Sequence, residues 1–271
     1  MTIAGSDSGG GAGIQADLKA FSFFHVFGTT AITAITAQNP KQVIAVQPLP
    51  SEIVSRQIEA IFAEIKIGAV KTGMLFSGDI IQVVADRLRE HPQVPLVVDP
   101  VMVATSGAKL LQDEAVEVLQ NLLLPRAAVI TPNLPEAQLL VGHELNTPRD
   151  MMAAAAALAR KYAAIVIVKG GHNRGNKSTD IVSDGCRFWE LSTPTVAAAA
   201  THGTGCSLSA AVAACIAVGN DPYTAIRKAK AYLFGALKAC IRIGPDVSAM
   251  DPPVSLVVEN VVFKELTYSA E

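Results

Sequence analysis

Short runs of apolar residues alternate with longer amphipathic segments along most of the chain. The runs 96–98, 128–130 and 165–168 contain no polar residue, which is typical of strands buried on both faces of a sheet. Helical periodicity and helix-start residues predict helices at 14–21, 51–65, 77–89, 112–124, 147–162, 207–218 and 222–240. This alternation predicts an α/β fold with a doubly wound, mostly parallel central sheet flanked by helices.

The second half of the chain adds two features to this pattern. Asp184-Gly185 separates two strand-like runs, so a small hairpin is expected near 179–191. The run 256–263 is largely apolar and is interpreted as an edge strand or an interface element. The pattern contains no repeat and no linker, so residues 1–271 are expected to form a single domain.

Composition limits the classes of protein that fit this pattern. Half of the residues are hydrophobic, 17% are charged and the net charge is −2, which indicates a compact globular protein without an electrostatic case for nucleic acid or anionic membrane. No apolar run approaches the ~20 residues of a membrane span, and we expect no secretory signal. The four cysteines form no Cys-x-x-Cys pair, which favours a cytoplasmic protein with free thiols.

A glycine-rich turn precedes the helix at 207–218 and is the strongest chemical signal. Its residues are Thr201-His202-Gly203-Thr204-Gly205-Cys206. Unpaired amides and the positive end of a helix dipole bind anions, phosphate above all. Cys206 stands at the same helix start, where a lowered thiol pKa is expected. The alternative is a tightly packed helix start with an inert buried cysteine.

A second glycine-rich stretch joins the strand expected at the N-terminus to the helix at 14–21. It runs from Gly5 to Gly13 and resembles a dinucleotide-binding fingerprint. The acidic residue expected about 20 positions later is missing, because 29–37 is uncharged. We therefore interpret the stretch as a loop that closes over a small ligand.

Polar side chains follow the C-terminal ends of the expected strands. They are Gln38, Lys71, Asp99, Asn133 and Lys169. Ligands of open α/β sheets bind at this edge, so these side chains and the turn at 201–206 are expected to face one cleft.

These motifs, in this order, resemble those of the ribokinase-like superfamily, and within it the hydroxymethylpyrimidine/phosphomethylpyrimidine kinases of thiamine biosynthesis. The resemblance spans residues 3 to about 218. The matching segments are 3–7, 10–19, 36–39, 71–74, 98–102, 131–137, 168–172 and 201–206.

The resemblance implies ATP-dependent phosphorylation of the hydroxymethyl group of 4-amino-5-hydroxymethyl-2-methylpyrimidine, followed by a second transfer to the monophosphate. The substrate residues it implies are Gly5, Asp17, Gln38, Met74 and Val101. An amide such as Gln38 both donates and accepts, which suits an aminopyrimidine edge.

The resemblance also implies a phosphate side of the site. The amides of Gly203, Thr204, Gly205 and Cys206 would hold the moving phosphoryl group, with Cys206 nearest the substrate hydroxyl as the expected proton acceptor. ATP or phosphate would contact Asp99, Asn133, Lys169 and His202, although His202 is also interpreted as orienting the loop. Magnesium would be held by Asp99 and Glu136, because this ion prefers oxygen ligands.

Three departures from the family pattern keep alternatives open. Residues 195–200 are poor in polar side chains, 6–9 lack a proline, and 241–271 match no expected motif. A pyridoxal kinase of the same superfamily is one alternative, although the flap at 103–107 lacks the cysteine associated with that activity. A non-catalytic pyrimidine-binding protein is another. A homodimer or other small homo-oligomer is expected in each case.

Overall fold

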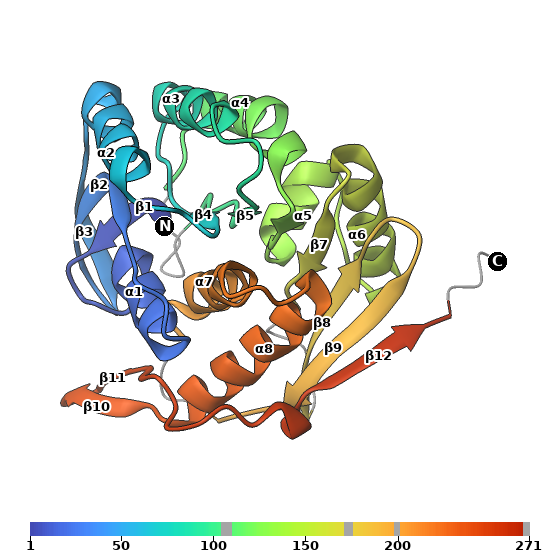
Figure 1. Cartoon of the computed structure of the whole chain (residues 1–271). Helices are drawn as coiled ribbons and strands as arrows, with labels where there is room; N and C mark the ends of the chain where they lie inside the picture. Colours follow the sequence, from blue (N-terminus) through green and yellow to red (C-terminus); the bar gives the residue numbers. More distant parts are fainter. Residues whose placement is uncertain (104–109, 171–175, 198–200, 268–271) are drawn as a thin grey trace.

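The computed structural model describes residues 1–103, 110–170, 176–197 and 201–267 (Figure 1). Ten strands form one sheet in the order β12-β9-β8-β7-β6-β5-β4-β1-β2-β3. These strands are β1 (Thr2–Asp7), β2 (Thr30–Asn39), β3 (Gln42–Pro48), β4 (Val70–Thr72), β5 (Leu96–Val98), β6 (Val129–Ile130), β7 (Ile165–Val168), β8 (Lys177–Ser183), β9 (Phe188–Pro194) and β12 (Val262–Leu266).

The sheet is parallel at its centre and antiparallel at both ends. Strands β2, β1, β4, β5, β6 and β7 pair in parallel. Strand β3 pairs antiparallel with β2 at one edge, and β8, β9 and β12 continue antiparallel from β7 at the other. The expected mostly parallel α/β sheet is confirmed, and so is the hairpin near 179–191, which forms β8 and β9.

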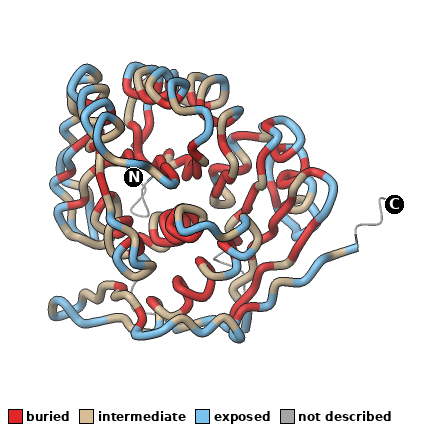
Figure 2. The backbone as a smooth tube through the Cα atoms, in the orientation of Figure 1, coloured by how far each residue is buried: buried red, intermediate tan, exposed pale blue. Residues whose placement is uncertain are grey.

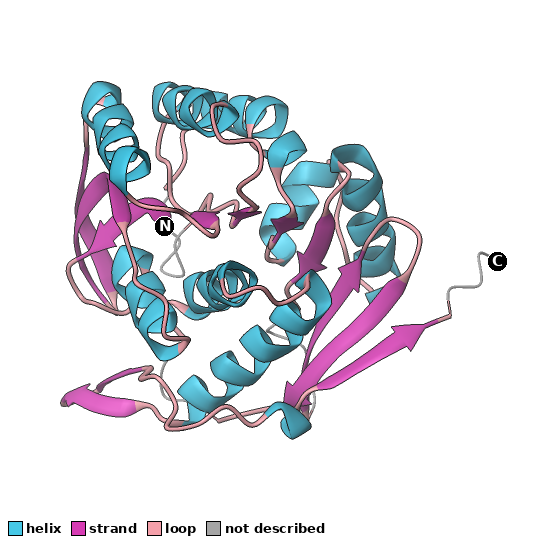
Figure 3. Ribbon diagram, in the orientation of Figure 1, coloured by secondary structure: helices cyan, strands magenta, loops and turns pink. Residues whose placement is uncertain are grey.

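Helices cover both faces of this sheet (Figures 1 and 3). One face packs against α2 (Ser51–Glu64), α3 (Gly78–Arg89), α4 (Asp113–Leu122), α5 (Leu134–Val141) and α6 (Pro148–Tyr162). The other packs against α1 (Gly13–Phe23), α7 (Thr204–Ala217) and α8 (Pro222–Lys238).

Successive strand residues join opposite hydrophobic clusters, which explains the all-apolar runs. Val98 and Ile130 pack with the α2–α6 layer, whereas their neighbours Val97 and Val129 pack with α1, α7 and α8. Because side chains alternate across a strand, a strand covered on both faces favours apolar residues throughout, and a polar residue there needs a buried partner.

Helix α7 is buried along most of its length, between α1 and α8 (Figure 2). Its small residues allow this close approach, and its N-terminus reaches the carboxyl ends of the central strands. Within the described residues, none of the helices combines the length and the apolar character needed to span a membrane.

Several elements were not expected from the sequence. Strand β3 is mostly exposed, so it lacks the apolar signature of the central strands. Helix α5 is only 8 residues long, too short for a clear helical stripe. The strands β10 (Ile241–Gly244) and β11 (Val247–Ala249) form a separate two-stranded sheet. By contrast, an edge strand or an interface element was expected at the apolar run 256–263, which leads through a short 3-10 helix (Val258–Asn260) into β12, an edge strand beside β9.

A fully buried ion pair joins α1 to the central sheet. Lys71 Nζ lies 2.9 and 2.8 Å from the two carboxylate oxygens of Asp17, and both side chains have no exposed surface. Thr2 Oγ1 donates to Asp17 Oδ2 at 2.6 Å. Burial opposes the charge of Lys71, but the carboxylate of Asp17 raises the pKa of this lysine above its ordinary value. Burial also raises the pKa of Asp17, against the opposing effects of Lys71 and Thr2. The two short contacts between the ammonium and the carboxylate oxygens are the geometry of an ion pair.

Removing one partner of this pair is expected to destabilise the protein strongly. Lys71→Met leaves the Asp17 carboxylate buried without its counter-charge, at a cost of about 3–5 kcal/mol in the free energy of unfolding. Arg56→Met breaks an exposed pair with Glu59 and should cost under about 1 kcal/mol. Urea denaturation of both variants measures the difference. Equal, small losses would contradict a buried charged pair.

Candidate active site

The candidate site lies where the carboxyl ends of β5, β6 and β7 meet the first turn of α7. Asp99 Oδ1 accepts from Lys169 Nζ at 2.9 Å and from Thr131 Oγ1 at 3.0 Å. Asp99 Oδ2 accepts from Ser209 Oγ of α7 at 3.1 Å. A Cβ atom on Gly205 would lie 3.1 Å from Lys169 Nζ. The start of α7 therefore rests directly on the Asp99–Lys169 pair.

Electrostatics keep that pair charged. Burial opposes ionisation of both groups, but the Lys169 ammonium holds the pKa of Asp99 below its usual value, and Asp99 raises the pKa of Lys169. An ammonium at the start of α7, next to helix amides, adds to an environment that favours phosphate oxygens.

Asn133 and Glu136 lie beside this pair at the start of α5, where they form a capping box. Asn133 Oδ1 accepts from the Glu136 N–H at 2.9 Å, and Glu136 Oε2 accepts from the Asn133 N–H at 2.7 Å. Burial raises the pKa of Glu136 to about 7, against the opposing effect of the Lys169 charge. Glu136 is thus a carboxyl group poised between its protonated and ionised forms near neutral pH.

The donor set fits magnesium only in part. Asp99 and Glu136 are oxygen donors close to one lysine, but within the described residues no group of three or more His, Cys, Asp or Glu side chains forms a metal cluster. Magnesium typically uses one or two carboxylates together with water and substrate phosphates. The residues present therefore fit an ion that arrives with a nucleotide.

The turn before α7 adopts the backbone that its glycines permit. Gly203 has φ +82° and caps α7, and a Cβ atom there would lie 1.8 Å from the carbonyl oxygen of Gly11. Only glycine fits this contact. The two glycine-rich stretches, distant in the sequence, thus touch through their backbones. The Thr204 N–H donates to the Thr201 carbonyl at 3.4 Å, and a helix start of this kind presents its following N–H groups to a ligand.

Cys206 lies in the first turn of α7, as expected, but its pKa is not lowered. The Gly13 N–H donates to its sulfur, yet burial raises the pKa of the thiol to about 11. The desolvation of this half-buried side chain outweighs the helix dipole and the nearby Lys71 charge. At neutral pH Cys206 is therefore a thiol, which corrects the expected thiolate.

The substrate residues implied by the family resemblance are only partly brought together. Gly5 abuts Met74, because a Cβ atom on Gly5 would lie 3.0 Å from the Met74 sulfur. Met74 packs in a small apolar cluster to which Val101 also belongs. Gln38 is the penultimate residue of β2 and is half-buried. These four residues remain candidates for a ring-binding surface.

Asp17 and His202 differ from the roles implied by the resemblance. The Asp17 carboxylate is buried with Lys71 and Thr2. It therefore holds α1 against the central sheet and has no exposed surface for a ligand. His202 Nε2 lies 2.9 Å from Asp7 Oδ2 and 3.1 Å from the Gln38 amide nitrogen. His202 thus faces Asp7 and Gln38 in this structure, which agrees with the loop-orienting interpretation.

Asp7 is the residue that sequence reasoning missed. Its carboxylate accepts from the N–H groups of Gly9, Gly11 and Ala12 at 2.8, 3.1 and 2.8 Å. An aspartate directly before a glycine-rich loop was the available signal, because such side chains often bind the following backbone amides. Other expected features, at 104–107, 171–172 and 198–200, lie outside the described residues.

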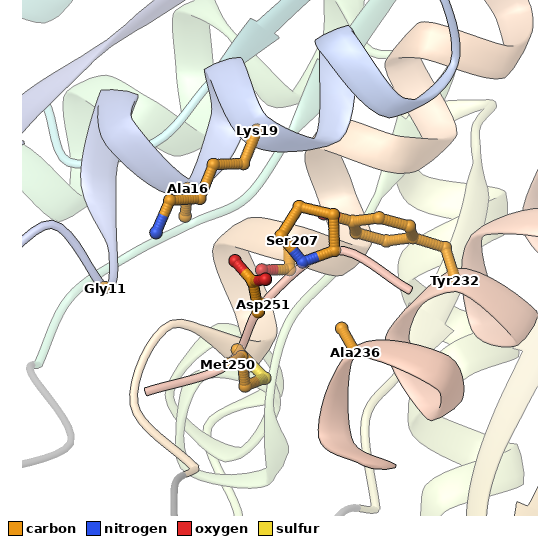
Figure 4. A pocket seen from close by; sticks show the side chains of 9 residues that line it. Gly11, Ala16, Lys19, Ser207, Tyr232, Ala236, Met250 and Asp251 are labelled. Carbon is orange, nitrogen blue, oxygen red and sulfur yellow. The ribbon is translucent and has the colours of Figure 1, made fainter. Parts of the chain in front are cut away.

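A small cavity behind the glycine-rich loop is not the candidate site. It lies between α1, α7, α8 and the segment 250–252 (Figure 4), and its volume is about 10 Å³. This is room for one water molecule at most, far less than a pyrimidine or a nucleotide needs.

Asp7 is expected to stabilise the folded protein in a pH-dependent way. Burial opposes its charge, but His202 and the loop amides lower the pKa of Asp7 in the folded state. The unfolded chain therefore binds more protons at acid pH, and this stabilisation is lost as pH falls through the folded pKa. Asp7→Asn should lower the free energy of unfolding by about 1.5–3 kcal/mol at pH 7, and by less at pH 3.

Urea denaturation at the two pH values checks this expectation, with Asp246→Asn on the exposed β10–β11 turn as the matched control. A loss of equal size at pH 7 and pH 3 would contradict a charged Asp7 that holds the loop.

Comparisons with known proteins agree with this geometry. The family model "Phosphomethylpyrimidine kinase" matches residues 7–251. A hydroxymethylpyrimidine/phosphomethylpyrimidine kinase from Bacillus subtilis is 45% identical over 245 residues, which is 90% of each chain.

Solved structures show the same fold. The pyridoxal kinase from Staphylococcus aureus in complex with AMP-PCP and pyridoxal has a TM-score of 0.87 at 37% identity, covering 98% of this chain and 97% of that one. The phosphomethylpyrimidine kinase from Clostridium difficile has a TM-score of 0.77 at 41% identity, covering 87% and 97%. Both enzymes are kinases, and the resemblance drawn from the sequence motifs is confirmed: the chain belongs to the phosphomethylpyrimidine kinase family.

Proposed function

We propose that this protein transfers a phosphoryl group from ATP to the hydroxymethyl group of 4-amino-5-hydroxymethyl-2-methylpyrimidine, and then to the resulting monophosphate, in thiamine biosynthesis. The observation that carries the residue assignment is the start of α7, where Gly205 lies against the Asp99–Lys169 pair and Gly203 against Gly11. Helix amides and a lysine meet there at the edge of the sheet, beside the Gly5–Met74 contact.

In this proposal the amides of Gly203, Thr204, Gly205 and Cys206 hold the moving phosphoryl group. The transition state of phosphoryl transfer is loose, so positioning and charge stabilisation matter more than base strength. Lys169 neutralises charge on the phosphates, and its contact with Asp99 keeps the ammonium at the edge of the turn.

Asn133 and Glu136 lie on the nucleotide side of the same edge. Magnesium bound with ATP would be held by Asp99 and Glu136, and it would neutralise charge that develops on the phosphate oxygens. Burial raises the pKa of Glu136, and a cation bound nearby would favour the ionised form of this carboxyl group.

The pyrimidine would lie on the other side of the turn. Met74 and Val101 would contact the faces of the ring, Gly5 leaves room at the strand end, and Gln38 would bind the aminopyrimidine edge. This arrangement favours the pyrimidine over pyridoxal. The Gln38 side-chain amide has a donor and an acceptor side by side, and these match the ring nitrogen and the adjacent amino group of an aminopyrimidine. The expected homo-oligomer and the cytoplasmic setting remain predictions.

A coupled ATPase assay with magnesium tests the substrate. The hydroxymethylpyrimidine, its monophosphate and pyridoxal are offered separately. We expect turnover on both pyrimidines and at least about ten-fold lower kcat/KM on pyridoxal. A higher kcat/KM on pyridoxal would show that pyridoxal, and not the pyrimidine, is the substrate. An absence of turnover with all three compounds would favour a non-catalytic binding protein.

Cys206 is the proposed proton acceptor nearest the substrate hydroxyl. Cys206→Ala should lower kcat by roughly 10²-fold, with the KM for the pyrimidine nearly unchanged. Because the pKa of this thiol is raised to about 11, the thiolate fraction grows with pH, and the wild-type kcat should rise between pH 7 and 9. The kcat of the alanine variant should stay flat over this range. Intact turnover of the variant with unchanged affinity would exclude this role.

A further inference from the structure

We propose that His202 is a positioning residue that sets the orientation of the Gln38 amide, and thereby which way round an aminopyrimidine ring binds. This inference rests on the proposed function, because it names what selects the substrate at the same site. It follows from hydrogen-bond accounting among Asp7, His202, Gln38 and Thr36, a group that we call the Asp7 network.

The first step is the proton on His202. Asp7 already accepts three backbone N–H groups, and these bonds favour its ionised form. An ionised carboxylate only accepts hydrogen bonds. His202 Nε2, which lies 2.9 Å from Asp7 Oδ2, must therefore carry a proton and donate it to Asp7.

The second step is the amide of Gln38, whose nitrogen is placed 3.1 Å from the same Nε2 atom and is here exchanged with the amide oxygen. A protonated Nε2 cannot accept from an NH₂ group, so this end must be the carbonyl oxygen. The two ends of an amide have nearly the same shape, and their hydrogen-bond partners decide which end is which.

Thr36 leads independently to the same orientation. Its single hydroxyl proton is used by the carbonyl oxygen of Ser6, at 2.9 Å. The Gln38 amide oxygen is placed 3.2 Å from Thr36 Oγ1, but with its proton on the shorter bond to Ser6 this hydroxyl can only accept, so an amide nitrogen suits this position better. The NH₂ end of Gln38 therefore faces Thr36. This orientation suits both neighbours, with the single Nε2 proton shared between Asp7 and the Gln38 oxygen.

A fixed amide presents a fixed order of hydrogen-bonding groups to a ligand. Gln38 keeps one N–H on the Thr36 side and one oxygen lone pair on the His202 side. A 4-aminopyrimidine edge matches this order only with its ring nitrogen toward Thr36 and its amino group toward His202. A pyridoxal ring has no amino group beside its ring nitrogen and cannot make both bonds with that edge.

His202 is held in place by more than Asp7. A Cβ atom on Gly11 would lie 2.8 Å from His202 Cδ2, so the imidazole is packed against the glycine-rich loop, and only 16% of its side chain is exposed. His202 also directly precedes Gly203. The same ring therefore links the residue that reads the pyrimidine edge to the turn that holds the phosphoryl group.

The tautomer of His202 can be measured without any assay of activity. Long-range ¹H–¹⁵N spectra of the full-length, histidine-labelled protein, assigned by comparison with His202→Gln, should show a protonated Nε2. An unprotonated Nε2 with the proton on Nδ1 would overturn the inference, whatever the enzyme phosphorylates.

Two substitutions then test the positioning role. In His202→Gln, the side-chain amide nitrogen reaches the position of Nε2 and can still donate to Asp7 and Gln38. In His202→Asn, the shorter side chain ends near the position of Nδ1, so this donor is lost. We expect the asparagine variant to lose roughly ten-fold in kcat/KM for the pyrimidine with less change for pyridoxal, and the glutamine variant to recover most of this loss. His143→Gln, at an exposed histidine, is the matched control.

The outcomes separate this inference from the alternatives. An equal loss on both substrates with a raised KM for ATP would instead make His202 a phosphate-binding residue and overturn the inference, as would unchanged selectivity in both variants. If the wild-type protein does not phosphorylate the pyrimidine at all, the proposed function fails, and the tautomer measurement still decides whether His202 orients Gln38.

Discussion

A backbone contact between two glycine-rich loops is the constraint on which the rest of the site depends. Gly203 lies so close to the Gly11 carbonyl that no side chain fits between them, and Gly203 adopts a left-handed φ that glycine tolerates best. The contact places the start of α7 against the loop that follows β1. In the proposed function, recognition of a ring at the end of β1 and β2 and binding of phosphate at α7 would therefore be joined through one backbone contact.

Buried charge surrounds this unit and makes its geometry specific. The Asp17–Lys71 and Asp99–Lys169 pairs join helices or strand ends that are distant in the sequence, and Lys230 pairs with Asp180 on the far side, where Asp180 also accepts from the Gly170 N–H. Burying ions is costly unless every partner is in place. Each pair thus penalises any arrangement in which its two elements separate.

The fold alone does not select the substrate. Kinases of pyridoxal and of phosphomethylpyrimidine share this architecture with the chain, and a fold hosts several activities through local changes in its site. The choice depends on a few groups with a defined donor and acceptor order. Gln38, which contacts Thr36 and His202, is the group to which we assign this property.

The sequence by itself determined the α/β class, the central strands and the kinase family, because buried strands must be apolar and glycine-rich turns leave a local signal. It also placed Asp99, Lys169 and the turn at 203–206 at one edge, since the ends of parallel strands meet there. Only the tertiary structure decided that Asp17 is buried with Lys71, that burial raises the pKa of Cys206, and that His202 faces Asp7. These outcomes depend on desolvation and on contacts between residues far apart in the chain, which no local pattern encodes.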